Sequence, residues 1–241
     1  LNYVRCHDDI GLGFDDADVR AAGYDPAMHR AFLIDYFTGR FPTSPARGMP
    51  FGTNEKTGDA RISGSLASLV GLEYALENHD EEGVAAAVRT ITLLHSIILS
   101  FGGLPLLYYG DAVGTLNNLE FLQDPSTQHD SRWVHRSRFD WDKAELRHQP
   151  GTVEQRIFSA LRRLIALRKE IPAFADFDNR TLIPFDNPNL LVYSRTDPEN
   201  WRNRVLVVGN FSAEPQTLAL EDLSVHGFFQ YGGMKDLCTG E

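Results

Sequence analysis

The sequence predicts an α/β domain followed by a small all-β domain. Two observations indicate the first domain. A long apolar helix at residues 82–101 leads, after a Gly-Gly break, into an apolar strand at 104–109, and residues 2–6 read as a second buried strand. The third observation is a change of pattern from about residue 180, where short β-type runs alternate with Asp, Asn, Pro and Gly turns. We place the boundary near residues 174–179.

Three further helices are predicted before that boundary, each from a recognisable start. Asp25 and Pro26 form an N-cap and first-turn pair ahead of an aromatic-rich helix. Ser65 can cap a second helix. Thr152 and Gln155 form a capping box before a third, which is the last helix that the sequence predicts. The expected strands of the all-β part lie at residues 190–195, 204–210 and 216–220.

Composition limits the possible partners. The chain has 241 residues, 42% hydrophobic content and a net charge of −10, which favours a globular protein with a neutral ligand over a nucleic-acid or anionic-membrane binder. The most membrane-like window is broken by Gly102, Gly103 and Pro105. Cys6 and Cys238 lie near opposite ends, so we expect buried or free thiols, and they leave the compartment open.

The α/β part holds too few strands to form a covered parallel sheet, which needs helices on both faces. The chain is therefore expected to be the end of a larger domain, and its first residue, Leu1, leaves targeting signals unread. In a β/α barrel, catalytic residues follow the carboxyl ends of the strands. His7, Asp8 and Asp9 occupy that position after the first strand, whereas Asp111, after the second, could equally cap a turn.

Five motifs carry a family resemblance. NYVRCHDDIG, ARGMPF, TGDARISGS, GGLPLLYYGD and DSRWVHR, in that order, resemble the C-terminal part of the amylosucrases, sucrose-using glucosyltransferases of the α-amylase superfamily. The likeness runs over essentially the whole chain. The His-Asp pair is shared across the superfamily, whereas the insertion carrying TGDARISG is specific to the amylosucrase branch. The resemblance implies that residues 1–175 form the last two units of a (β/α)8 TIM-type barrel, with an inserted subdomain at about 10–63, and that 176–241 form most of a β-sandwich.

The resemblance also implies roles for site residues. Asp8 matches the acid that holds the sugar hydroxyls and stabilises the oxocarbenium-like transition state without attacking it. His7 matches a histidine that hydrogen-bonds the glucosyl unit. Asp9 resembles a second acid, which borders the fructosyl side and could pair with an arginine of the insertion; the alternative is a loop-capping acid. Arg132 matches the arginine that closes the glucosyl pocket by pairing with an aspartate from an early barrel loop.

Other positions concern the acceptor. Arg30 and Arg61 match arginines that line the acceptor channel, although each could be an ordinary surface or helix-packing arginine. Gly52 stands where amylosucrases commonly carry glutamine, which weakens the case for polymer synthesis and makes hydrolysis more credible. His95 and His135 are interpreted as core or surface histidines, since neither has metal-ligand neighbours at useful spacing.

The predicted reaction of the complete polypeptide is retaining glucosyl transfer from sucrose to an α-1,4-glucan with release of fructose, without a cofactor or metal. The implied partners are sucrose and α-glucan. A retaining enzyme needs a nucleophile and an acid/base about 5 Å apart. Asp8 and Asp9 are neighbours rather than an opposed pair, so the 241 residues alone are expected to be inactive. Two alternatives stay open: a sucrose hydrolase of the same family, and a non-catalytic barrel-type binding subunit.

Overall fold

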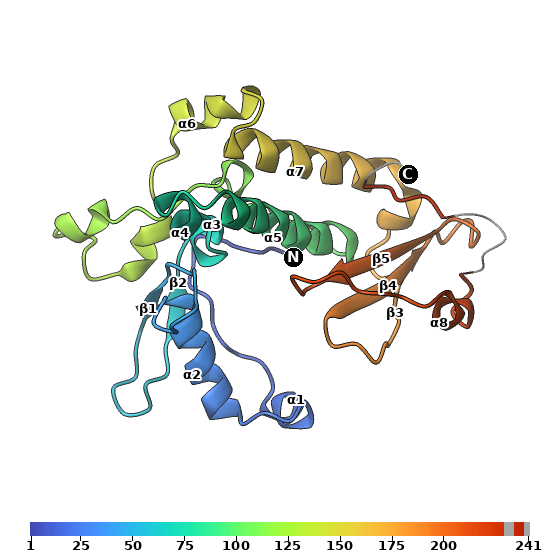
Figure 1. Ribbon diagram of the computed structural model, residues 1–241, viewed down its shortest axis with the longest axis horizontal. Coiled ribbons are helices and arrows are strands. Elements are labelled where there is room, and N and C mark those ends of the chain that lie inside the picture. The colour runs from blue at the N-terminus through green and yellow to red at the C-terminus, as the bar shows by residue number, and fades with distance from the viewer. Residues whose placement is uncertain (229–233, 239–241) are drawn as a thin grey trace. The chain divides into compact units, whose positions relative to one another are not determined.

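The computed structural model describes residues 1–228 and 234–238 (Figure 1). The chain divides into two compact units. The first unit consists of Tyr3–Thr92 and Leu107–Ser159, and the second of Leu1–Asn2, Leu93–Leu106 and Ala160–Glu241. These units do not coincide with the domain boundary proposed near residues 174–179, which stays a prediction.

In the first unit, the predicted insertion contains two helices and one hairpin. The helices are α1 (Asp16–Ala21) and α2 (Pro26–Phe37), and the hairpin pairs β1 (Met49–Phe51) with β2 (Arg61–Ser63). The Asp25 carboxylate accepts a hydrogen bond from the Met28 amide at 2.9 Å, so the predicted N-cap is confirmed. An antiparallel bridge between Ile10 and Ile62 holds the two ends of the insertion side by side.

The helix predicted after Ser65 is interrupted. Ser65 caps a short helix, α3 (Leu66–Leu69), and a separate helix, α4 (Leu72–Glu77), follows it. Between them Gly71 has φ +90°, and a Cβ there would lie 2.8 Å from Pro45. A left-handed glycine in close contact with a proline therefore ends the first helix, which apolar periodicity alone could not reveal.

The rest of the first unit is a series of short helical turns. They are η1 (Asp111–Val113), η2 (Glu120–Gln123), η3 (Ser131–His135), α6 (Trp141–Glu145) and η4 (Leu146–His148). Both strands of the hairpin contact η3. The buried apolar residues of this unit include Ile34, Ile62, Leu66, Leu72, Val134 and Ile157. Two long helices, α5 (Glu81–Ser100) and α7 (Val153–Glu170), each contribute residues to both units.

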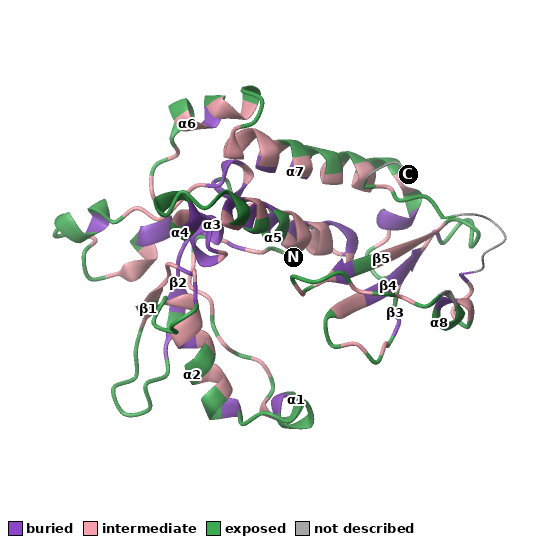
Figure 2. Cartoon of the chain, in the orientation of Figure 1, coloured by how far each residue is buried: buried purple, intermediate pink, exposed green. Residues whose placement is uncertain are grey.

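Helix α5 matches the predicted helix at residues 82–101. Its most apolar 18-residue window has a mean hydropathy of 1.5, so length and composition alone would allow it to cross a membrane. A core helix passes the same test, and 39% of that window is buried; Figure 2 shows buried and intermediate residues along the helix. His95, on this helix, is fully buried, as expected of a core histidine.

The two strands predicted at residues 2–6 and 104–109 are not formed as ladders. Their segments meet in a single parallel bridge between Asn2 and Pro105. The Asn2 amide donates to the Leu104 carbonyl at 2.9 Å, and the Leu106 amide donates to the Asn2 carbonyl at 2.8 Å. The parallel direction agrees with a β/α arrangement. A parallel strand depends on neighbours and covering helices, however, so a local apolar pattern does not by itself produce one.

The second unit contains an antiparallel sheet of β3 (Arg180–Leu182), β4 (Leu190–Thr196) and β5 (Arg204–Asn210), in that order. The strand predicted at residues 216–220 is wrong. Leu220 begins a short helix, α8 (Leu220–Ser224), which the sequence did not predict. Helical spacing places Leu223 in a small core whose members are Ile183, Val192, Leu223 and Phe228. A short turn, η5 (Pro172–Phe174), precedes the sheet.

An arginine is buried in this second unit. Arg195 has 0% exposure, and its guanidinium donates to the Asn179 side chain and to the carbonyls of Ser100 and Asp176. The hydroxyl groups of Tyr193 and Ser100 lie 2.6 Å apart. The end of α5 is therefore attached to β4 by polar contacts that satisfy a buried charge.

Candidate active site

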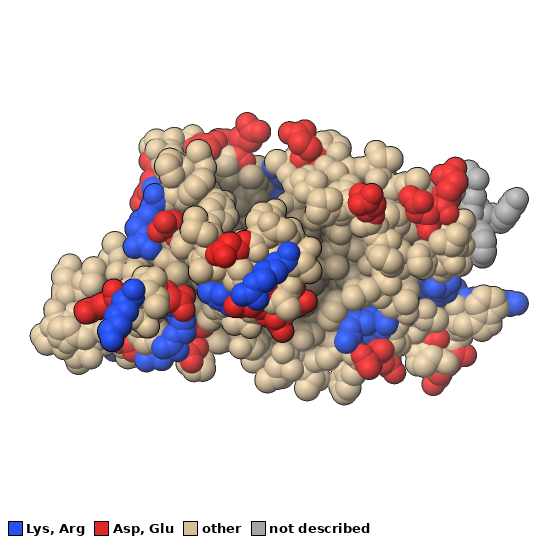
Figure 3. Space-filling view, turned by 90° about the horizontal axis from the view of Figure 1, so that it is seen from below, with Lys and Arg blue, Asp and Glu red and all other residues tan. Residues whose placement is uncertain are grey.

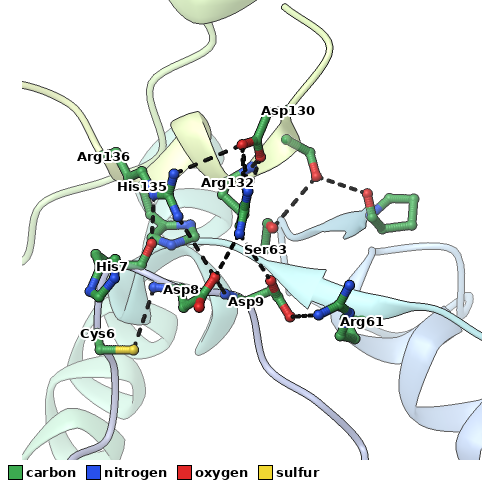
Figure 4. A network of polar contacts seen from close by, with 12 residues as sticks. Cys6, His7, Asp8, Asp9, Arg61, Ser63, Asp130, Arg132, His135 and Arg136 are labelled. Atoms are coloured by element: carbon green, nitrogen blue, oxygen red, sulfur yellow. Dashed lines mark hydrogen bonds and ion pairs between the residues drawn. The ribbon is translucent and has the colours of Figure 1, made fainter. Parts of the chain in front are cut away.

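A cluster of charged side chains in the first unit contains most of the predicted site residues (Figure 4). The segment after residue 3, the strand β2 and the turn η3 with the residue on either side of it each contribute to the cluster. Its members are the carboxylates of Asp8, Asp9 and Asp130 and the guanidinium groups of Arg61, Arg132 and Arg136. Equal numbers of opposite charges meet here, so the cluster suits an uncharged ligand.

Asp8 is the exposed acid of the cluster. Half of its side-chain surface is accessible, and its Oδ1 lies 3.0 Å from Arg132 Nη1 and 3.7 Å from Arg136 Nη2. The Asp9 amide donates to the same oxygen at 3.2 Å. The hydrogen bond from Arg132, followed by that from the Asp9 amide, lowers the Asp8 pKa to about 2. Asp8 therefore stays ionised at neutral pH and can stabilise positive charge, but it cannot supply a proton.

Asp9 is buried, with 5% side-chain exposure. Its Oδ2 lies 3.3 Å from Arg61 Nη1, so the expected arginine partner from the insertion is Arg61. Its Oδ1 lies 3.9 Å from Arg132 Nη1 and has no hydrogen-bond partner among the residues that the structure describes. The neighbouring acids thus differ in environment: Asp8 faces solvent, whereas Asp9 is buried between two arginines.

The Arg132 guanidinium binds the carboxylate of Asp130 through two of its nitrogens. Its Nε lies 2.9 Å from Asp130 Oδ1 and its Nη2 lies 2.8 Å from Asp130 Oδ2. Asp130 also caps η3 by accepting a hydrogen bond from the Arg132 amide at 3.0 Å. These contacts raise the Arg132 pKa. The signal in the sequence that could have indicated this ion pair is the segment Asp130-Ser131-Arg132. The pairing of Arg132 with an aspartate of an early barrel loop stays a prediction.

Arg5 connects the chain segments that carry the residues of the cluster. Arg5 is 3% exposed, and it donates to the Gly64 carbonyl at 3.0 Å and to the Asp8 carbonyl at 2.9 Å. The Gly64 amide donates to His135 Nδ1 at 3.2 Å. Burial, and then the nearby charge of Arg5, lowers the His135 pKa to about 4, so the ring is neutral at pH 7. Sequence reasoning missed Arg5, because a charged residue inside an apolar run gives no indication of its partners.

Asp111 lines a hollow that His135 also lines. The hollow is lined by Ser65, Tyr108, Tyr109, Gly110, Asp111, Thr115 and His135. Asp111 is 5% exposed, and burial raises its pKa to about 7 although the charge of Arg5 opposes the shift. The Tyr108 hydroxyl donates to the His135 carbonyl at 3.1 Å. Asp111 is therefore a buried acid that lines the same hollow as His135, and its role as a turn cap stays a prediction.

Two predicted site residues have other surroundings. Arg30 lies 2.5 Å from the Asp16 carboxylate and donates to the carbonyls of Leu12 and Phe14, so it attaches α2 to the start of the insertion. These contacts favour its alternative role as a packing arginine. The His7 side chain is exposed, and its carbonyl accepts a hydrogen bond from Arg136 Nε at 2.6 Å. Their sugar-binding roles stay predictions.

In residues 1–228 and 234–238, no group of three or more His, Cys, Asp or Glu side chains is arranged to hold a metal ion. Cys6 is partly buried and Cys238 is exposed, and both are free thiols, as expected from their positions in the sequence.

Comparison with known proteins gives distant relatives. A cyclomaltodextrinase from Geobacillus thermopakistaniensis (strain MAS1) is 27% identical over 168 residues, which is 60% of this chain and 25% of that protein. A trehalose synthase from Thermus thermophilus is 31% identical over 152 residues, which is 55% of this chain and 15% of that protein. Distant homologues of the chain are α-amylase superfamily enzymes. The matches span a quarter or less of these curated relatives.

No protein-family model matches the chain. Among solved structures, the sucrose 6F-phosphate phosphorylase from Thermoanaerobacter thermosaccharolyticum matches with a TM-score of 0.45 and 15% identity, over 88% of this chain and 39% of that one. The superfamily part of the expectation from the sequence agrees with the curated relatives. These relatives do not decide whether sucrose is the donor, so that part of the expectation stays a prediction.

Proposed function

We propose that the polypeptide containing this chain transfers the glucosyl group of sucrose to an α-1,4-glucan, with retention of configuration and release of fructose. The observation that carries the proposal is the environment of Asp8: an accessible carboxylate, held ionised by Arg132, beside a buried acid paired with Arg61. The order of motifs from NYVRCHDDIG to DSRWVHR supports sucrose as the donor.

The geometry suits Asp8 to electrostatic stabilisation. Cleavage of a glycosidic bond develops positive charge on the sugar ring, and a fixed carboxylate at that position lowers the barrier. Because its pKa is about 2, Asp8 cannot protonate the leaving group at neutral pH. The nucleophile and the acid/base, which retaining transfer requires about 5 Å apart, are proposed to come from other parts of the polypeptide.

The charge balance of the site fits an uncharged donor. Asp8, Asp9 and Asp130 face Arg61, Arg132 and Arg136, so a phosphorylated or nucleotide-linked sugar would gain no net attraction. On the surface that Figure 3 shows, basic side chains also lie next to acidic ones. The bond between the two anomeric carbons of sucrose stores enough free energy for transfer. The proposed reaction therefore needs no activated cofactor or metal.

Water is the competing acceptor, and a sucrose hydrolase is the alternative function within the same family. Gly52, which stands at the position of an acceptor-side glutamine, has φ +61°, and a Cβ there would lie 3.3 Å from Arg61 Nη2. A glutamine would be strained in this backbone conformation, so the hairpin itself favours glycine. The amide that could hold a glucan is thus missing for a structural reason, and this observation favours the hydrolase alternative.

Incubation of the full-length polypeptide with sucrose, after chelation of metals, tests the proposal. We expect fructose release in all cases, and growth of glucan chains when glycogen is added. Fructose release with glucose as the only other product would identify the hydrolase. The absence of fructose release and of glucan cleavage would instead favour the non-catalytic binding subunit.

A further inference from the structure

Phe51 lies against two arginines of the charged cluster. The Arg132 Cζ is 4.5 Å from the centroid of its ring, and the Arg61 Cζ is 4.9 Å from the same centroid. Both distances fall within the range in which a guanidinium is attracted by the face of an aromatic ring. Phe51 is only partly buried, so packing in a core does not account for its position.

The backbone of the hairpin determines this arrangement. Phe51 and Arg61 are directly opposed partners of β1 and β2, so the register places their side chains next to each other. The Ser131 hydroxyl donates to the Pro50 carbonyl at 3.0 Å. This bond holds η3 against the hairpin next to both residues of the contact, since Pro50 precedes Phe51 and Ser131 precedes Arg132. The ring of Phe51 therefore contacts both Arg61 of the insertion and Arg132 of η3.

Arg132 has two possible carboxylate partners besides Asp130. Its Nη1 is 3.0 Å from Asp8 Oδ1 and 3.9 Å from Asp9 Oδ1, and the latter oxygen has no hydrogen-bond partner among the described residues. A small movement of the guanidinium would transfer it from Asp8 to Asp9. We propose that Phe51 is a positioning residue, whose ring keeps Arg132 on Asp8 and Arg61 on Asp9.

The functional consequence rests on the proposed function. If Arg132 keeps Asp8 in place for the glucosyl group and Arg61 borders the acceptor side, loss of the ring loosens both contacts. A ring–guanidinium contact at a partly exposed site corresponds to about a two- to fivefold change in an equilibrium. We therefore expect Phe51→Leu to lower the ratio of transferred glucose to free glucose about two- to fivefold and to lower kcat, with a smaller change in the KM for sucrose.

Product analysis in the full-length polypeptide tests this expectation. Phe51→Tyr retains the aromatic face and should keep the ratio within about twofold of the wild type. The matched control is Phe41→Leu, which removes a 38% exposed ring of the same insertion whose neighbours are Phe32 and Tyr36 rather than arginines. This control should leave the ratio unchanged. Equal effects of Phe51→Leu and Phe51→Tyr, or no effect of either, would overturn the positioning role.

A second measurement needs no substrate. The urea midpoints of Phe51→Leu, Arg61→Met and the double variant form a mutant cycle, and the proposal predicts that the double variant loses less stability than the sum of the single variants. Strict additivity would overturn the proposal. Failure of the wild type to release fructose would contradict the proposed function alone, because the cycle reports the ring–arginine contact independently of any reaction.

Discussion

Asp8→Asn is the change that tests the assigned chemistry most sharply. The substitution keeps the shape of the side chain and removes its charge. Asp8 is half exposed and shares Arg132 with Asp130, which holds the guanidinium through two nitrogens. Arg132 therefore retains a carboxylate partner in the variant, and we expect the fold around η3 to be preserved.

The expected loss is in turnover. Removal of one preorganised electrostatic contact from a transition state costs on the order of 10²- to 10³-fold in kcat. Asp8 adds a full charge, held ionised by the Arg132 hydrogen bond at 3.0 Å, so we expect about 10³-fold or more. Asp9→Asn should lose less turnover, because Asp9 is buried against Arg61 and does not face the solvent-accessible side of the cluster.

The assay is fructose release by the full-length polypeptide at saturating sucrose, together with the unfolding midpoint of each variant. Asp178→Asn is the matched control, since it removes an 85% exposed acid paired with Arg180 at 2.8 Å in the second unit. This control should keep wild-type turnover. Comparable, small losses in Asp8→Asn and Asp9→Asn would refute the assignment of the transition-state role to Asp8.

Three further predictions concern the acceptor, pH and stability. Arg61→Ala should raise free glucose relative to transferred glucose while fructose release stays within a few-fold of wild type. Arg30→Ala tests the same predicted role for Arg30. A lower unfolding midpoint with an unchanged product ratio would identify Arg30 as a packing residue. The His135 pKa is lowered to about 4 and the Asp111 pKa is raised to about 7. The contribution of His135 to folding stability should therefore increase as pH rises from 4 to 6.5, whereas that of Asp111 should decrease as pH rises from 4 to 7. Urea titrations at pH 5 and 7 should therefore show a gain in stability with pH in Asp111→Asn and a loss in His135→Gln, and equal slopes would contradict this. Arg195→Met should lower unfolding stability by about 3 kcal/mol, measured by urea denaturation, because one buried and two partly buried acceptors lose their donor; an unchanged midpoint would contradict the structural role.

Features fixed by neighbouring residues were predictable from the sequence. The Asp25 cap is confirmed, and the helix after Thr152 begins as predicted at Val153, with the Gln155 amide donating to the Thr152 hydroxyl at 3.2 Å. The acid–arginine pairing of Asp9 with the insertion also agrees with the expectation. In each case the partners are either a few residues apart or belong to a motif that the resemblance identified.

Features that depend on distant partners were not predictable. The two apolar segments expected as strands form one bridge between Asn2 and Pro105, because a strand requires a ladder that its own sequence does not encode. The residues 216–220 read as a strand, yet Leu220 begins a helix that places Leu223 in a core. Arg5 escaped notice because its acceptors are main-chain carbonyls, which every sequence contains.

In the proposed function, the chain belongs to an enzyme whose glucosyl donor is sucrose. The most direct test is the ratio of kcat/KM values of the full-length wild type for sucrose, maltoheptaose and trehalose, measured under one set of conditions. The proposed function predicts that sucrose is the preferred substrate by at least about tenfold, which corresponds to about 1.4 kcal/mol in transition-state binding. Preference for maltoheptaose or trehalose over sucrose would contradict it.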